Sequence, residues 1–409
     1  MSPVPEEARG IYMESGGGKN TALLILSALL TAAGAAVFLY CVLGDLGHRA
    51  WQVFLSNYLF WTGLAFGSVF LMSLMNLTSA LWVRPFKRLV EAPAAFLPVA
   101  YFLFWLIFWG RKTLLPWITS PIPEKALYLN APFFFAREGI GLLLLVLSAI
   151  ALLYFSLKGD VEFLHRDGEL SSERIQKLRQ LQVGASIVFS GLYVLIMTYV
   201  SWDLVMSLSP KWVSTLFGAY FFTGCLYTAI AALSVSAGLA FYRTGLRHHI
   251  KSNNFHALGK TLLAFLMVFG DFLFSQYFLS WYGNKPDETR FFLERFRFEP
   301  WAGISIAAGI MILPFPFVVL LNRKIKMLPL PMMVLAIVIL TGMWFERFLL
   351  VVPSLWTHET LPLGWIELII SLGFLGLMAF CMLVFLRLFP LLPLSDPLLR
   401  KDLEPAIQK

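Results

Sequence analysis

The chain has 409 residues, of which 58% are hydrophobic and only 14% are charged. An average soluble domain has roughly 25% charged residues, so a soluble fold of this size could not bury so much apolar surface. The net charge of +8 does not indicate nucleic-acid binding, because Lys and Arg lie in short segments between long apolar runs. A lipid membrane is the expected partner, and no nucleic acid is expected.

Ten apolar runs follow one another along the chain, each with the roughly 20 residues that a spanning helix needs. They are continuous and lack the short alternating segments of a β-barrel. The sequence therefore predicts an all-α polytopic membrane protein with ten transmembrane helices. The predicted spans are residues 21–44, 52–77, 86–110, 132–157, 181–207, 213–242, 256–282, 301–322, 328–352 and 362–388.

Lys and Arg are distributed unequally between the two sides of the predicted helices. The side that includes residues 1–20 and 389–409 holds about twice as many as the other, which indicates that it is cytoplasmic. Both tails are therefore expected in the cytoplasm. Of the longer connections, residues 158–180 are predicted to form a solvated cytoplasmic loop with a short helix. Residues 283–300 are predicted to form a turn on the outer face, with room for an interfacial helix.

A weak internal repeat relates helices 2–5 to helices 6–9. Tyr58-Leu-Phe-Trp-Thr-Gly63 in helix 2 corresponds to Ala219-Tyr-Phe-Phe-Thr-Gly224 in helix 6, and Trp202-Asp203 in helix 5 corresponds to Phe345-Glu346 in helix 9. An even shift preserves orientation, so the repeat predicts two parallel four-helix bundles. The alternative is chance similarity among aromatic-rich spans. The predicted bundles are residues 52–210 and 213–353, flanked by helix 1 with its loop (residues 21–50) and by helix 10 (residues 362–388).

Ionisable residues inside spans cost ~2.5–3.5 kcal/mol at a helix centre on insertion scales, so each indicates a function or a structural pairing. Carboxylates at graded depth suit a proton relay, whereas a carboxylate paired with Arg137 or Arg347 suits helix packing. For Asp203 and Glu346 both interpretations stay open. The packing interpretation is favoured for Asp271 and for the acids near the interfaces, Glu91, Glu138 and Glu367. The proton-path candidates are Asp203, Glu346, Asp271, Tyr199, Arg347, Glu138 and Glu91.

Residues that would hold a redox centre are not arranged for it in the sequence. The six histidines lie in loops or at span ends, and there is neither a Cys-x-x-Cys-His motif nor a cysteine cluster. No haem or iron–sulfur cluster is therefore expected on this chain, and no metal or catalytic residue is predicted. The isolated residues Cys41, Cys225 and Cys381 are expected to be packing residues.

Several segments resemble signatures of the alternative complex III family. These bacterial complexes oxidise quinol and pass electrons to periplasmic carriers, and they contain two integral subunits related to the membrane anchor of polysulfide reductase. The resemblance covers roughly residues 50–390 and implies ten helices with two four-helix bundles. The matching segments are Asn57-Tyr-Leu-Phe-Trp-Thr-Gly63, Arg84-Pro-Phe-Lys-Arg-Leu-Val-Glu-Ala92, Trp202-Asp-Leu-Val-Met-Ser-Leu-Ser-Pro-Lys-Trp212, Ser214-Thr-Leu-Phe-Gly-Ala-Tyr-Phe-Phe222 and Trp281-Tyr-Gly-Asn-Lys-Pro-Asp-Glu-Thr289.

One departure from the family pattern distinguishes between its two integral subunits. The quinol-binding subunit has a histidine in helix 2, and Phe66 occupies that position here. The resemblance therefore implies the second subunit, often called F, a non-catalytic structural partner with a proposed proton-translocating role in the bacterial inner membrane. Its implied partners are the quinol-binding paralogue, an iron–sulfur subunit and haem c subunits, which would carry the quinol and the cofactors.

Two alternatives stay open. The chain could bind quinol itself and anchor an iron–sulfur or molybdopterin oxidoreductase, or it could be a secondary transporter that uses acids at the midplane. Co-purification with redox subunits distinguishes the transporter from the other two.

Overall fold

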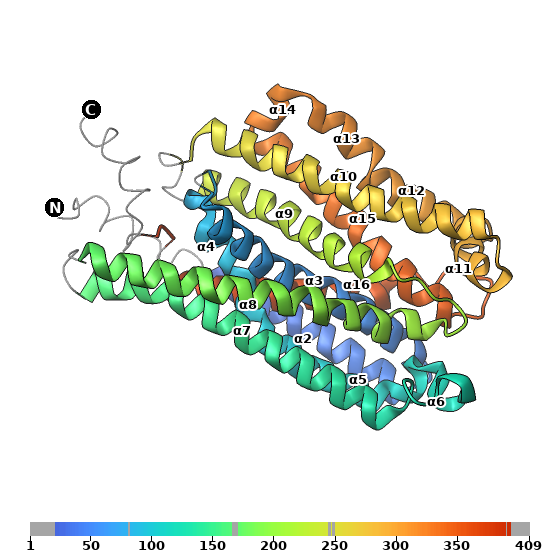
Figure 1. Cartoon of the computed structure of the whole chain (residues 1–409). Coiled ribbons are helices and arrows are strands. Elements are labelled where there is room, and N and C mark those ends of the chain that lie inside the picture. Colours follow the sequence, from blue (N-terminus) through green and yellow to red (C-terminus); the bar gives the residue numbers. More distant parts are fainter. Residues whose placement is uncertain are drawn as a thin grey trace.

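The computed structural model describes residues 21–80, 82–165, 171–243, 247, 250–389 and 391–393. The predicted N-tail, residues 1–20, and most of the predicted C-tail, residues 389–409, lie outside this part of the chain. In the described residues the regular elements are helices, and ten of them are long and apolar enough to cross a membrane (Figure 1). The protein is therefore an all-α polytopic membrane protein, as the sequence predicts.

Successive spans run in opposite directions, and two of the ten are divided into shorter helices. The spans are α2 (Thr21–Leu43), α3 (Gly47–Thr78), α4 (Lys87–Glu91) with α5 (Leu97–Leu114), α7 (Ala131–His165), α8 (Ser172–Leu204), α9 (Phe217–Arg243), α10 (Ser252–Gly283), α12 (Ala302–Ile312) with α13 (Pro314–Leu321), α15 (Pro329–Leu355) and α16 (Trp365–Leu388). The short elements are η1 (Arg84–Phe86), η2 (Ala92–Phe96), α6 (Pro116–Thr119), η3 (Pro123–Lys125), η4 (Met206–Leu208), α11 (Pro286–Phe296) and α14 (Arg323–Met327).

The predicted solvated loop over residues 158–180 is largely wrong, because α7 continues to His165 and α8 already begins at Ser172. The predicted spans stop where polar residues begin. A helix can nevertheless continue beyond the lipid, because its backbone hydrogen bonds lie within the helix. Ser171 caps α8 by accepting a hydrogen bond from the Arg174 backbone, and the Arg174 side chain pairs with Glu162 on α7 at 2.6 Å. The interfacial helix allowed for in residues 283–300 is present as α11.

Two groups of four spans form the body of the protein, and α3 lies against both. In the first group α3, α5, α7 and α8 pack around a ring, and in the second α9, α10, α12–α13 and α15 do so. Helix α3 also packs on α9 and α15, which joins the groups. Helices α2 and α16 form a pair beside them, with α16 against α3 and η2. These contacts lie where the two predicted bundles require them, while the sequence repeat itself stays a prediction.

Glycines on α3 allow α9 to approach closely. A Cβ atom at Gly67 would lie 2.3 Å from the Cys225 carbonyl oxygen, and one at Gly63 would lie 2.7 Å from the Cys225 sulfur. The two glycines are four residues apart and so lie on one face of α3, the spacing that membrane helices use for tight contacts. The Trp-Thr-Gly segment noted in the sequence therefore has a packing role at the centre of the molecule.

Prolines within the spans leave backbone carbonyls that side chains then satisfy. Pro316 has no N–H for the Ile312 carbonyl, and the Tyr227 hydroxyl donates to that carbonyl at 3.0 Å. Pro353 likewise leaves the Leu349 carbonyl free, and Arg295 on α11 donates to it at 2.8 Å. In a membrane such carbonyls need a partner inside the protein. The second contact also fixes α11 to the end of α15.

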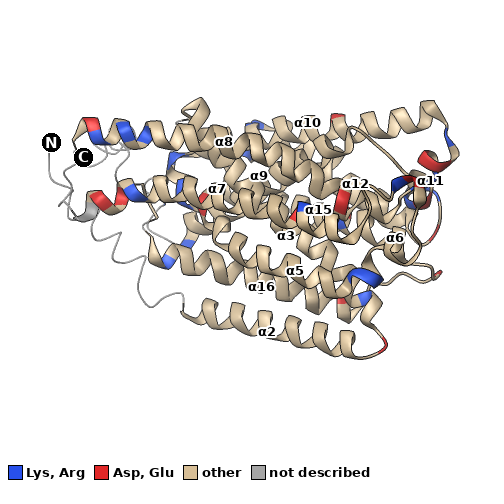
Figure 2. Cartoon of the chain, turned by 60° about the horizontal axis from the view of Figure 1, so that its bottom comes forward, with Lys and Arg blue, Asp and Glu red and all other residues tan. Residues whose placement is uncertain are grey.

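Charged side chains are concentrated near the two ends of the helices, and long stretches between them carry none (Figure 2). Arg387 near the end of α16 donates to the Thr21 hydroxyl at the start of α2 at 3.5 Å. The first and last described helices therefore meet at one end of the bundle. This end is called the inner end below, after its predicted cytoplasmic side, and the opposite end is called the outer end.

Candidate functional site

Charged side chains inside the spans gather in three buried clusters, one toward the inner end and two toward the outer end. Burying a charge is unfavourable unless it is paired, so each cluster is described with its partners. The inner cluster is Arg88, Glu91, Ser156 and Asp160. The first outer cluster is Tyr58, Tyr128, Arg137, Glu138 and Asp203. The second outer cluster is Tyr220, Cys225, Glu346 and Arg347.

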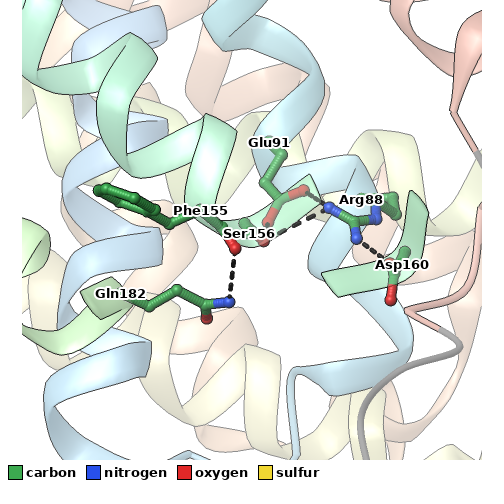
Figure 3. A network of polar contacts seen from close by, with 6 residues as sticks. All are labelled: Arg88, Glu91, Phe155, Ser156, Asp160 and Gln182. Atoms are coloured by element: carbon green, nitrogen blue, oxygen red, sulfur yellow. Dashed lines mark hydrogen bonds and ion pairs between the residues drawn. The ribbon is translucent and has the colours of Figure 1, made fainter. Parts of the chain in front are cut away.

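The inner cluster joins the short helix α4 to α7 (Figure 3). Arg88 lies between two acids and donates to Glu91 on its own helix and to Asp160 on α7. The Ser156 hydroxyl donates to Glu91 at 2.6 Å. All four side chains are at most 1% exposed. A single cation thus holds two acids that come from different helices, which fixes α4 against α7.

Sequence reasoning selected Glu91 but missed Arg88 and Asp160. Arg88 falls at the start of the predicted span 86–110 and was not a candidate, and Asp160 falls in the predicted solvated loop 158–180. A signal was nevertheless present in the spacing, because Ser156 and Asp160 are four residues apart and Arg88 and Glu91 are three apart. Each pair therefore shares a helix face, provided that α7 is extended past residue 157.

The first outer cluster lies where α7 and α8 meet near their outer ends. Arg137 binds Asp203 through two hydrogen bonds, Nε to Oδ2 at 2.8 Å and Nη2 to Oδ1 at 2.7 Å. The guanidinium also lies over the Tyr128 ring, 4.0 Å from its centre. Burial, followed by the charge of Asp203, raises the pKa of the Tyr128 hydroxyl, which therefore keeps its proton at neutral pH.

Glu138 is the one acid of the three buried clusters whose carboxylate oxygens meet no hydrogen-bond donor among the described residues. It is 1% exposed, and both of its carboxylate oxygens are buried without a donor. Its electrostatic neighbours are Asp203, Arg137 and Tyr58, and the buried Tyr58 hydroxyl lies beside the side chain of Thr62. A buried carboxylate in this setting is stable when it holds a proton or binds water. The cluster thus has two acids and a single arginine.

The second outer cluster joins α9 to α15 and is fully paired. The Tyr220 hydroxyl donates to Glu346, and Arg347 donates to both carboxylate oxygens of Glu346 at 3.0 and 2.8 Å. Arg347 also donates to the Phe221 carbonyl at 3.3 Å and lies 4.2 Å from the centre of the Phe221 ring. One acid, one cation and one hydroxyl thus satisfy one another between two central helices.

The remaining acids and Tyr199 lie elsewhere. Asp271 is exposed on the outside of α10, away from the three clusters. Tyr199 packs edge-on against Trp202 and makes no hydrogen bond to Asp203 within the described chain. Glu367 pairs with Arg49 at 2.9 Å and also accepts from the backbone of Gly364 at the start of α16. Of the sequence candidates, therefore, only Glu138, Asp203 and the pair Glu346–Arg347 are brought into clusters with another candidate.

An apolar segment of α7 separates the inner cluster from the first outer cluster. Glu138 and Ser156 lie ~27 Å apart along this helix at ~1.5 Å per residue. The buried positions between them are apolar, and they are Leu142, Leu145, Val146, Ala149 and Leu152. The buried face of α7 therefore supplies no polar side chain between the two clusters.

A groove of about 1200 Å³ runs between the α2–α16 pair and helices α3, α9 and α15. Its walls are mostly aliphatic and aromatic, with Trp61 and Trp344 among them. The Trp344 Nε1 group donates to Asn57 at 3.0 Å, and Asn57 donates to Ser371 at 2.9 Å, which gives the groove a small polar patch. Its size and lining suit a long apolar ligand. Phe66 is 1% exposed and is not part of this lining.

The comparisons with known proteins add no relative to these observations. No protein-family model matches this chain, and no curated protein matches it.

Proposed function

We propose that this chain is a non-haem integral subunit of a quinol:electron-acceptor oxidoreductase of the alternative complex III kind. In this proposal it lies in the bacterial inner membrane with both tails in the cytoplasm. It supports the catalytic subunits and carries part of a proton route. The sequence segments that resemble that family motivate the assignment, and the ten spans are compatible with it.

The observation that carries the proton route is the buried, unpartnered carboxylate of Glu138 beside the ion-paired Asp203. A carboxylate in a proton route has to gain and lose a proton repeatedly, which is unfavourable if each protonation breaks an ion pair. Glu138 avoids this cost, whereas Asp203 and Glu346 are each held by an arginine through two hydrogen bonds. Intramembrane acids mark proton relays in pumps and transporters.

In the proposed route Glu138 exchanges the proton near the outer end. Arg137 and Asp203 hold the local charge in place, and the Tyr58 hydroxyl, which lies within electrostatic reach of Glu138, contributes a further polar group. The inner cluster is a second polar site, and transfer between the two sites along α7 requires water or motion, because the buried face of that helix is apolar. Glu346, Arg347, Glu91, Asp271 and Tyr199 stay predictions from the sequence and have no step in this route.

Membership of a redox complex is tested by purifying the native assembly through a tag on this chain in mild detergent. The expected result is a set of co-purifying subunits on a denaturing gel, together with the absorption spectrum of haem c in the same fraction. A lone chain without haem or iron–sulfur partners would contradict the proposal and favour a secondary transporter.

The groove between α16 and α3 favours a second candidate function, that of a quinol-binding anchor. An isoprenoid quinone has a long apolar tail and a polar ring, and the groove offers an apolar lining with a polar patch at Asn57. Organic extraction of the purified assembly, compared with an Asn57→Leu variant, tests this candidate. Equal quinone content in both preparations would rule out binding at this patch.

A further inference from the structure

One face of α10 is uncovered along the whole helix. Exposed positions recur every three or four residues, as on a single helix face. The exposed positions from Lys260 to Tyr282, called the α10 stripe, are Lys260, Ala264, Met267, Val268, Asp271, Phe274, Tyr277, Phe278, Leu279, Trp281 and Tyr282. Every member between Lys260 and Trp281 is apolar or aromatic except Asp271. The stripe is therefore a lipid-like surface with one acid in it.

The stripe itself shows how deep Asp271 lies. Trp281 and Tyr282 at its outer end are 62% and 77% exposed, as expected of aromatic residues at a membrane interface. Lys260 lies ~31 Å away along the helix, which matches the ~30 Å hydrocarbon layer and allows its side chain to reach the opposite interface. Asp271 lies ~15 Å from Trp281 and hence near the midplane.

An exposed carboxylate at this depth is anomalous in a lone chain. Ionisable residues within membranes face the interior of a bundle or a water-filled cavity and are paired there. The acids of the three clusters follow this rule and are buried, while Glu162 and Glu173, which are not fully buried, lie near helix ends. Asp271 is the one charged side chain of the described spans that is exposed near the middle of a helix. Its position therefore requires a partner that the described chain does not supply.

A second copy of this chain would not satisfy that requirement. A symmetric contact between two α10 stripes would bring two carboxylates together. A different contact would need an exposed Lys or Arg near the midplane, and the described spans have none. A cation at this depth must then come from another membrane protein.

We infer that the α10 stripe is the docking surface for a transmembrane helix of a different integral subunit, which presents an Arg or Lys to Asp271. The apolar residues on either side of Asp271 pack on that helix, and the buried polar contact fixes its register. The inference deepens the proposed function only in assuming that the chain has an integral partner; it does not depend on the chemistry of the complex.

The test uses the full chain in its native membrane with a photo-crosslinking amino acid at Phe274, one turn from Asp271. The matched control places the same group at Ile187 on α8, which is 59% exposed and also lies far from both helix ends. Each position is combined with Asp271, Asp271→Asn and Asp271→Leu. The expected result is an adduct between Phe274 and one other integral protein. Its yield falls about fivefold or more in Asp271→Leu, falls less in Asp271→Asn, and any Ile187 adduct is unchanged.

Three outcomes overturn the inference: an adduct with a second copy of this chain, crosslinking to lipid alone, or a Phe274 adduct whose yield is the same in Asp271→Leu. A normal elution profile and thermal stability of the variants in detergent shows that they fold. If haem and iron–sulfur subunits fail to co-purify while the Asp271-dependent adduct persists, the proposed function fails and this interface stands. If they co-purify without the adduct, the interface fails alone.

Discussion

The two outer clusters contain similar residues at similar depth, but they differ in whether every acid has a cation as its partner. In the second outer cluster Glu346 is met by Arg347 and by the Tyr220 hydroxyl, so its carboxylate is fully paired. In the first outer cluster the single Arg137 is occupied by Asp203, and Glu138 is left without a partner. A cluster with one acid per arginine therefore holds helices together, whereas a cluster with two acids per arginine leaves one acid that can bind a proton.

The largest effect is expected from removing the cation of the fully paired cluster. Arg347→Met leaves Glu346 buried without its cation, and breaking a buried pair in this way costs about 3–5 kcal/mol. Unfolding by SDS titration in mixed micelles measures the loss. The double variant Glu346→Gln with Arg347→Met removes the stranded charge and should regain much of it. Equal losses in the single and double variants would show that Glu346 is not stranded by the change.

A smaller loss is expected in the first outer cluster from Asp203→Asn. This change removes the negative charge and one of the two acceptor oxygens that bind Arg137, and it should cost about 1–3 kcal/mol. The loss is limited because Arg137 is 13% exposed and keeps its contacts with the Tyr128 and Phe133 rings. The same SDS titration applies. A loss as large as that of Arg347→Met would erase the difference between the clusters.

Glu138→Gln is expected to change the free energy of unfolding by about 1 kcal/mol or less, because no hydrogen bond of the described chain is lost. Glu346→Gln is the matched comparison, since it weakens a satisfied ion pair. It should be more destabilising than Glu138→Gln under the same conditions. A reversed order would mean that Glu138 has a strong partner and would remove the basis of the comparison.

The smallest effect is expected outside the membrane, at the exposed pair Arg290–Glu294 on α11. Their side chains are 77% and 31% exposed and lie 2.7 Å apart, four residues along the helix. Water and salt screen such a pair, so Arg290→Ala should cost about 0.5 kcal/mol or less. This variant is the reference for an exposed ion pair. A loss of stability larger than that of Asp203→Asn would contradict the expectation that solvent screens this pair.

Hydropathy predicted the fold because the requirement for about 20 apolar residues per span is local in sequence. The ten spans followed from it. The sequence also named Arg137 and Arg347 as possible partners of intramembrane acids without assigning the acids, and the structure pairs them with Asp203 and Glu346. Span ends were less accurate at residues 158–180, where polar residues continue a helix instead of ending it. Which partner an acid finds depends on neighbouring helices. For this reason the sequence named Tyr199 as the tyrosine of the proton path, whereas in the structure Tyr128 is the tyrosine that lies against Arg137.

The unpartnered state of Glu138 is beyond sequence reasoning for the same physical cause. Glu138 and Asp203 belong to different helices, and only packing shows that both approach the single Arg137. The inner cluster was missed in part for the same reason, since Arg88 and Asp160 meet across α4 and α7. Residue type and depth identify the candidate acids. The cations that lie beside each acid in the folded structure decide which of them is left without a partner.

The most direct test of the central claim is the ratio of protons translocated to electrons transferred by the purified complex in proteoliposomes. Glu138→Gln should lower this ratio while the electron-transfer rate measured with an uncoupler is retained, and Glu346→Gln should leave the ratio unchanged in the protein that remains folded. An unchanged ratio in Glu138→Gln would contradict the assignment of Glu138 as the proton-exchanging group.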